Sequence, residues 1–238
     1  MRGARKGMPA AFSAVAAAAM LLASAIAPGM AAGVKGGPLF MPEKGSFQIL
    51  VNGQPKGKEE FEIAPSNGNW VAKGSSEIQG ADGVTRVTGT LQLHGDGTPV
   101  SYEWSTQGAK KAGATISFNG PTATIELKLE GRRPFTQQFT FGSAQIAVLD
   151  NNLYYQYAVL ARLYDREKKG EQTFSVLVPQ ELTPGSLTME SLGEQKADGK
   201  KLEELAVKTQ DLEVDLYLDG EKLVRIVAPS TNAEIDRL

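Results

Sequence analysis

Short segments in which apolar and polar residues alternate dominate the sequence, and this period of two restricts the fold more than any other feature. In the segment TRVTGTLQLH, for example, single residues of the opposite face separate Val87, Gly89, Leu91 and Leu93. Successive side chains of a β-strand point to opposite faces, so such a segment predicts a strand with one covered and one wet face. Segments of this kind recur along most of the chain, and we count roughly 13.

Turn signals separate these segments at short intervals. Asn52-Gly53 and Asn67-Gly68 favour two-residue hairpins, because both residues of such a turn tolerate a positive φ. A Gly-Asp-Gly run at residues 95–97 marks another turn. Strands joined by frequent short turns predict an antiparallel meander. No motif recurs at a fixed period, which argues against a propeller or a solenoid.

One segment breaks this pattern and predicts a helix over residues 150–166. Its apolar positions, spaced by three or four residues, are Leu149, Leu153, Tyr157, Leu160 and Tyr164. This spacing is typical of an amphipathic α-helix, and Asp150, Asn151 or Asn152 could provide the N-cap. Two interpretations stay open. The helix supplies core, with tyrosine hydroxyls at its rim, or it covers an apolar cavity whose mouth the tyrosines line.

The first 32 residues have the pattern of a targeting segment. Arg2, Arg5 and Lys6 precede an apolar run over residues 10–27, and small residues follow it. This pattern predicts a signal peptide over residues 1–32 and an exported protein, periplasmic or secreted, with a membrane anchor as the alternative. No other stretch reaches the roughly 20 apolar residues of a spanning helix. Residues 33–44, rich in Gly and Pro, predict a flexible lead-in, and residues 45–238 a single β-rich domain.

Composition excludes several classes of site. The chain has no cysteine, so a disulfide, a thiol nucleophile and a thiolate metal site are all excluded. Removal of residues 1–32 would take three of the 25 Lys and Arg, leaving 22 cations against 27 Asp and Glu and a formal charge of −5. An acidic exported protein is a poor candidate for nucleic-acid binding, which favours basic patches.

Catalytic and metal-binding patterns are weak. His94 is the single histidine, lies beside a turn, and has no G-x-S-x-G motif to provide a nucleophile. Asp211, Glu213 and Asp215 share one face of a predicted strand, but without a calcium-loop motif we expect a solvated face. Glu103, between two aromatic residues, leaves a glycan-acting hydrolase as the least favoured alternative. We therefore predict a non-enzymatic protein without a cofactor or a metal.

Three sequence segments resemble segments of exported bacterial β-proteins of unknown function. They are G-x-F-x-I-x-V-N-G at residues 45–53, D-G-x-P-x-x-Y at residues 96–102, and the closing LVRIVAPSTNAEIDR. The resemblance implies a mainly β fold: a long, curved antiparallel meander that forms an incomplete barrel, with one helix packed inside or across its mouth. That shape is similar to that of periplasmic lipoprotein carriers, which hold acyl chains in such a groove. The functional residues of those carriers have no matching positions here.

The apolar helix within a β meander predicts binding of an apolar ligand, such as a lipid or an acylated molecule. Burial of an alkyl chain would drive binding, at about 0.8 kcal/mol per CH₂ group. The residues expected to line the site are Tyr102, Trp104, Leu153, Tyr157, Leu160 and Tyr164. The alternative is a cell-envelope structural or interaction module that binds a protein partner along exposed sheet edges. Helix side chains that close-pack against the strands would favour this alternative.

Overall fold

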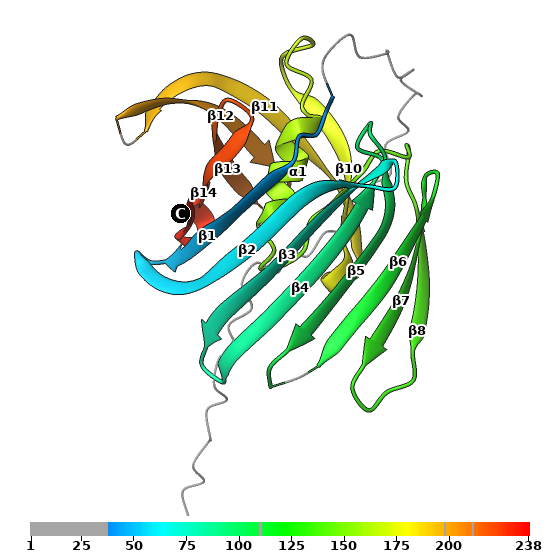
Figure 1. Ribbon diagram of the computed structural model, residues 1–238. Coiled ribbons are helices and arrows are strands. Elements are labelled where there is room, and N and C mark those ends of the chain that lie inside the picture. Colours follow the sequence, from blue (N-terminus) through cyan, green and yellow to red (C-terminus); the bar gives the residue numbers. More distant parts are fainter. Residues whose placement is uncertain (1–37, 110, 198, 211) are drawn as a thin grey trace, which may run out of the picture.

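The structure, a computed structural model, describes residues 38–238 with the exception of residues 110, 198 and 211. These residues form fifteen strands, one α-helix and two short 3-10 helices (Figure 1). The predicted signal peptide, residues 1–32, lies outside the described residues.

All fifteen strands belong to one sheet. Eight precede the helix: β1 (Glu43–Val51), β2 (Gln54–Ser66), β3 (Asn69–Gly80), β4 (Gly83–Leu93), β5 (Pro99–Gln107), β6 (Ala112–Asn119), β7 (Thr122–Leu129) and β8 (Phe135–Thr140). The short β9 (Ile146–Val148) leads into the helix, α1 (Tyr155–Leu163). The rest are β10 (Gln172–Val178), η1 (Pro179–Glu181), β11 (Thr183–Ala197), β12 (Lys200–Lys208), β13 (Glu213–Asp219), β14 (Lys222–Ala228), η2 (Pro229–Thr231) and β15 (Ala233–Arg237).

The strand order shows two meanders that meet where the two ends of the chain pair. From β1 the chain runs outward to β8, and from β9 it returns strand by strand to β15, which pairs with β1. Neighbouring strands pair in antiparallel fashion, except that β9 and β10 are parallel. Since β8 and β9 end the order as two separate edges, the described sheet does not close. The predicted open, mainly antiparallel β fold is confirmed.

The predicted hairpin turns are also confirmed. Asn52 and Gly53 have φ values of 52° and 70°, and Asn67 and Gly68 have 51° and 80°. Two consecutive positive φ values define the type I′ turn, whose twist matches that of the flanking strands. These turns join β1 to β2 and β2 to β3 with two-residue loops.

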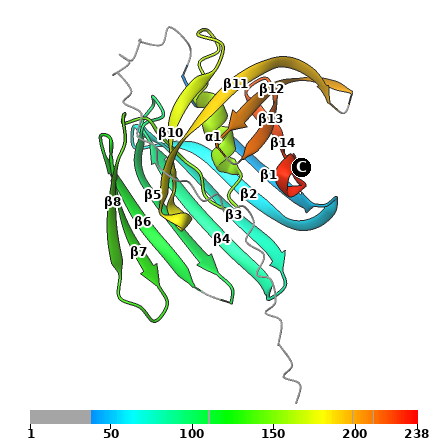
Figure 2. The same cartoon turned by 180° about the vertical axis from the view of Figure 1, so that it is seen from behind.

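The core lies between the inner face of the curved sheet and α1. Figure 2 shows the helix in the hollow of the sheet, with β1–β5 on one side and β10–β13 on the other. One row of paired residues crosses β2 to β7 on this inner face, and each is at most 1% exposed: Ile63, Ala72, Leu91, Tyr102, Ile116 and Ile125. The alternation in the sequence therefore marks the covered face.

The helix is shorter than residues 150–166, the predicted range. It begins at Tyr155, because Asn152 adopts a left-handed conformation with a φ of 64°, which no regular helix contains. It ends at Leu163, because Tyr164 is already extended, with a ψ of 119°. The backbone conformation of the flanking residues, which the apolar spacing does not reveal, therefore limits the helix at both ends.

The predicted flexible lead-in, residues 33–44, needs correction at its C-terminal end. β1 begins at Glu43, two residues before the predicted domain, and Phe40 is only 1% exposed. The side chain of Phe40 contacts the ring of Trp70 at a centroid distance of 5.7 Å. Burial of this aromatic ring anchors the start of the domain.

Two glycines make room for the helix on the inner face. Gly74 of β3 and Gly89 of β4 pair directly. A Cβ atom on Gly74 would lie 2.3 Å from Cδ1 of Tyr155, and one on Gly89 would lie 2.7 Å from Cδ1 of Leu153. Both distances are far below van der Waals contact, so the close approach of α1, and of Leu153 just before it, to the sheet requires glycine at both positions.

We expect Gly74→Ala to lower the free energy of unfolding by about 1–3 kcal/mol, because the added methyl group overlaps the ring of Tyr155. Urea-induced unfolding followed by tryptophan fluorescence measures this change. Gly142→Ala is the matched control, because a Cβ atom there meets nothing within 4 Å. The control should change the free energy by less than about 0.5 kcal/mol. Equal stability of the two variants would contradict the close approach at Gly74.

Candidate functional site

A side chain from a distant strand caps the N-terminus of α1. Glu59 of β2 is 0% exposed, and its two carboxyl oxygens accept hydrogen bonds from the backbone N–H groups of Tyr154 at 2.7 Å and Tyr155 at 3.1 Å. The first N–H groups of a helix have no partner inside it, so a buried helix end requires an acceptor. Burial raises the pKa of Glu59 to about 8, although both N–H groups lower it. The carboxyl group is therefore mostly protonated at pH 7.

Asp150 ties the segment before the helix to two other parts of the fold. Its carboxyl oxygens accept hydrogen bonds from the hydroxyl of Tyr102 and from the backbone N–H of Gln180, both at 2.8 Å. Burial raises the pKa of Asp150 to about 7, while these hydrogen bonds lower it. None of the predicted N-cap residues, Asp150, Asn151 and Asn152, caps the helix, because α1 begins later and Glu59 provides the acceptor.

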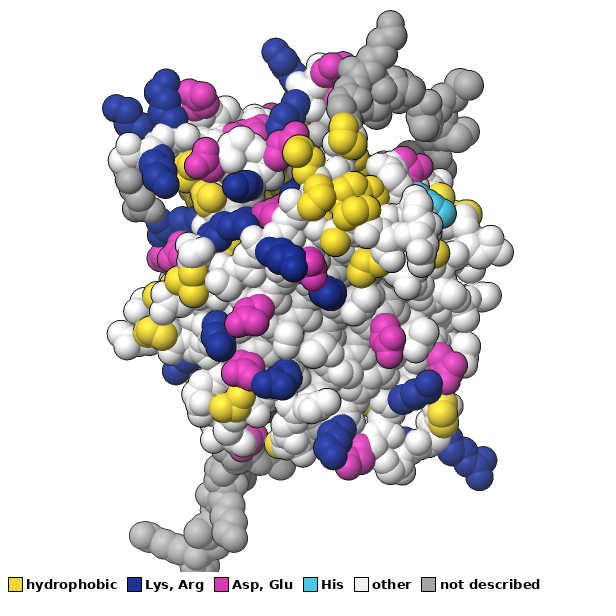
Figure 3. All heavy atoms as spheres, in the orientation of Figure 1, with side chains coloured by type: hydrophobic (Ala, Val, Ile, Leu, Met, Phe, Trp, Pro, Cys, Tyr) yellow, Lys and Arg dark blue, Asp and Glu magenta, His cyan; other side chains and the backbone are white. Residues whose placement is uncertain are grey.

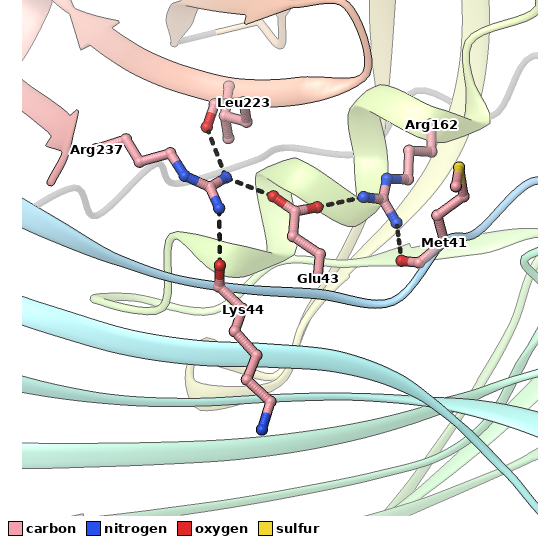
Figure 4. A network of polar contacts seen from close by, with 6 residues as sticks. All are labelled: Met41, Glu43, Lys44, Arg162, Leu223 and Arg237. Atoms are coloured by element: carbon pink, nitrogen blue, oxygen red, sulfur yellow. Dashed lines mark hydrogen bonds and ion pairs between the residues drawn. The ribbon is translucent and has the colours of Figure 1, made fainter.

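A buried ion network fastens the other end of α1 (Figure 4). Arg162 in the last helical turn and Arg237 of β15 both donate to the carboxylate of Glu43 in β1. Arg162 also donates to the backbone oxygen of Met41 at 3.4 Å, and Arg237 to that of Lys44 at 2.9 Å. Burial lowers the pKa of Arg162, and the negative charge of Glu43 raises it. One carboxylate thereby joins the first strand, the last strand and the helix.

The helix fills the groove of the sheet. The space left between α1 and the inner face near Leu91, Leu93 and Leu160 measures about 10 Å³. This is room for one water molecule at most, whereas ligand pockets measure about 300–1,000 Å³. The helix side chains close-pack against the strands, which is the arrangement that favours an interaction module.

The six residues predicted to line a ligand site surround this filled groove. Their exposed fractions are 0% for Tyr102, 1% for Leu153 and Leu160, and 4% for Trp104 and Tyr164, while Tyr157 is partly buried. The hydroxyl of Tyr164 donates to the backbone oxygen of Gly170 at 2.9 Å and accepts from the N–H of Ser191 at 3.2 Å. The structure brings the six together as core, and their role in ligand binding stays a prediction.

The two edges of the sheet differ in their protection. β9 has three residues, and each of them, Ile146, Ala147 and Val148, is at most 5% exposed. β8 has six residues and pairs only with β7 among the described strands. The segment FTQQFTF at residues 135–141 contains no charge, proline or glycine. Charges, prolines and bulges are the usual features that keep a sheet edge from pairing, so β8 presents an open edge.

The inner face of the sheet beside β8 is apolar and partly open. Phe135 and Phe139 lie opposite Leu127 and Ala123 of β7, so their side chains share the inner face. Phe135 is 50% exposed and Leu129 is 37% exposed, whereas Leu127 and Phe139 are partly buried. We call Leu127, Leu129, Phe135 and Phe139 the inner shelf. A shallow depression of about 530 Å³ adjoins the shelf at Leu129.

Two residues that the sequence offered for catalysis have no catalytic surroundings. Nδ1 of His94 contacts Oδ1 of Asn69 at 3.1 Å beside an exposed turn. Glu103 is exposed on the outer face of β5, whereas the aromatic side chains on either side of it point inward. Glu103 therefore does not lie beside the rings of Tyr102 and Trp104, because neighbouring residues of a strand face opposite sides of the sheet.

The predicted acidic stripe of Asp211, Glu213 and Asp215 is only partly visible. Asp211 lies outside the described residues, and Glu213 forms an ion pair with Lys208 at 2.9 Å. Over the described part of the chain, no three His, Asp or Glu side chains group as ligands for a metal ion. No helix in that part combines the length and the apolar character needed to cross a membrane.

Comparison with known proteins identifies a similar fold and gives no function. No family model and no curated protein matches the chain. The structure is similar to the crystal structure of a β-barrel-like protein of domain of unknown function DUF1849 from Brucella abortus. The TM-score is 0.55 and the sequence identity 9%, over 82% of this chain and 94% of that chain. At this identity, the likeness shows that the two chains share a β-barrel-like fold.

Glu59 makes the stability depend on pH. Because the folded state raises its pKa from 4.5 to about 8, its stabilising contribution is complete below pH 4.5 and is lost as the pH rises towards 8. We expect Glu59→Gln to remove this loss, so that the stability of the variant relative to the wild type rises by about 3–4 kcal/mol between pH 5 and pH 8. Urea unfolding at several pH values provides the measurement.

The matched control is Glu60→Gln, which makes the same substitution at the exposed neighbour on the outer face of β2. Its stability curve should run parallel to that of the wild type. Asp150 contributes a decline of the same sign, between about pH 4 and pH 7, because its pKa is raised from 3.8 to about 7. Parallel curves for Glu59→Gln and the wild type would refute the proposed protonation of Glu59.

Glu43→Gln should lower the free energy of unfolding by about 3–5 kcal/mol, because it leaves the buried Arg162 and the partly buried Arg237 without their counter-charge. Glu62→Gln is the control. Glu62 also accepts from two cations, at 2.8 Å each, but its partners Lys44 and Lys73 are exposed, so its replacement should change stability little. Figure 3 shows that Lys, Arg, Asp and Glu side chains are interspersed over this side of the molecule. Thermal unfolding of both variants tests this difference, and an equal loss would show that burial of the network is unimportant.

Proposed function

We propose that this protein is a non-enzymatic interaction module of the cell envelope that binds an extended segment of a partner protein along β8. The observation that carries this proposal is the open edge of β8, which is uncharged and borders the partly exposed inner shelf. The signal-peptide pattern of residues 1–32 supports export to the periplasm or out of the cell.

The chemistry of such binding follows from strand geometry. The outer edge of β8 offers backbone N–H and C=O groups to an added strand, and these hydrogen bonds supply affinity for any extended chain. Every second side chain of that strand would lie on the inner face, next to Phe135 and Phe139. A partner segment with apolar residues at alternate positions would therefore bind best.

The buried carboxyl groups support a role without catalysis. Glu59 and Asp150 are the two carboxyls whose pKa burial raises to about 8 and about 7, a property that acid–base catalysts often share. Both are enclosed in the core. Glu59 accepts two backbone N–H hydrogen bonds from the start of α1, and Asp150 accepts one from Gln180 and one from the hydroxyl of Tyr102. These hydrogen bonds position α1 and the segment that precedes it.

A second candidate is binding of an apolar or acylated ligand on the inner face. The partial exposure of Phe135 and Leu129 on the inner shelf favours it. A ligand under α1 itself would have to displace the helix, because the space there is about 10 Å³. Native mass spectrometry after incubation with mixed phospholipids tests this candidate, which requires adducts that release lipid on activation. A clean protein mass would exclude it.

The strand-binding proposal predicts that a synthetic peptide KKFTQQFTKK, a copy of β8 with flanking lysines for solubility, protects β8. Hydrogen exchange of the wild-type protein should slow at the β8 amides that point away from β7 when the peptide is added, because these amides gain acceptors.

The control peptide is KKFPQPFTKK, in which two prolines remove backbone donors and disfavour an extended ladder. It should leave the exchange of β8 unchanged. Equal protection by both peptides, or none by either, would refute strand addition at this edge.

A further inference from the structure

We infer that β8 binds a second copy of this chain, through an antiparallel β8–β8 pair that joins two sheets edge to edge. This inference rests on the proposed function, because it uses the same open edge and names its occupant. Figures 1 and 2 show β8 at the end of the sheet, where β7 is its one neighbour among the described strands.

The β8 sequence is complementary to itself in the antiparallel register that places Gln137 on the two-fold axis. A two-fold axis normal to the sheet keeps the inner face of both copies on the same side, so each residue must pair with one of its own face. With the axis at Gln137, Phe135 lies opposite Phe139 of the second copy, and Thr136 lies opposite Gln138. All of these partners share a face. Two cross-strand aromatic pairs then cover the exposed ring of Phe135.

The charges beside β8 favour the antiparallel direction. Arg132 and Arg133 precede the strand, and residues 134–145 carry no charge. In the antiparallel register, Arg133 approaches Phe141 of the second copy, an aromatic partner for the guanidinium. The two Arg133 residues are then about 26 Å apart along the strands, well beyond the screening length of about 8 Å. A parallel pair would instead place the two Arg-Arg sequences side by side.

The edge formed by β9 would limit the assembly to two copies. β9 is buried and short, so it offers no second pairing surface. A self-complementary contact at a single edge forms a closed dimer, whereas a free second edge would allow a filament. One strand pair is a small interface, so we expect a dimer that forms at high micromolar concentrations.

Cysteine trapping tests the register, and the chain has no cysteine of its own. In Gln137→Cys the two sulfurs meet at the axis, where opposite Cα atoms are about 4.5–5.5 Å apart, within the range of a disulfide. Gln138→Cys is the matched control, because its two copies lie on a diagonal about 7–8 Å apart. Under mild oxidation, followed on non-reducing gels, Cys at 137 should cross-link at least tenfold faster. Equal rates would overturn the register.

Sedimentation velocity of the wild-type protein up to about 0.5 mM tests the association itself. A concentration-dependent shift to the dimer supports the inference, and Gln137→Lys should weaken association at least tenfold, because two ammonium groups would meet at the axis. A monomer throughout overturns it. If KKFTQQFTKK still protects β8 in that case, strand addition stands without self-pairing; if the peptide also fails, both proposals fall.

Discussion

The rest of the fold depends on the position of α1 in the hollow of the sheet, and the hydrogen bonds from the start of the helix to Glu59 hold it there. A strongly curved sheet has an apolar hollow, and this hollow is covered only if the helix stays in it. Glu59 holds the N-terminal end from β2, and Glu43 holds the C-terminal end through Arg162. The glycines at 74 and 89 let the helix approach closely enough for both contacts. Each of these features helps to keep the helix in the hollow.

The filled hollow changes where binding is expected. The sequence predicted an apolar groove that would hold a ligand, yet α1 occupies the hollow of the sheet with close-packed side chains. The partly open apolar surface lies instead at the inner shelf and the β8 edge, at the end of the sheet away from the helix (Figure 1). The asymmetry between an open β8 and a short, buried β9 is the basis of the proposed assembly through one strand-pairing contact.

Local patterns in the sequence predicted much of the fold, because alternation and turn chemistry are properties of a few adjacent residues. The hairpin at Asn52 and Gly53 and the inward face of β4 are examples. The functional role of Glu59 was missed, although a signal existed. In EEFEI, Glu59 has the same parity as Phe61 and Ile63, so a carboxyl group occupies a core position. Only a partner from elsewhere in the chain explains it.

The sequence by itself determined the strands, their turns, the inward face of most of them and the existence of one helix, since each depends on spacing within a short segment. Tertiary structure decided the limits of that helix, the pairing of β1 with β15 and the difference between the two edges. These depend on residues about 95 to 190 positions apart, such as Glu59 with Tyr155 and Phe47 with Arg237. Contacts over such separations leave no periodic trace in a single sequence, because they follow from how the sheet curves and where its ends meet.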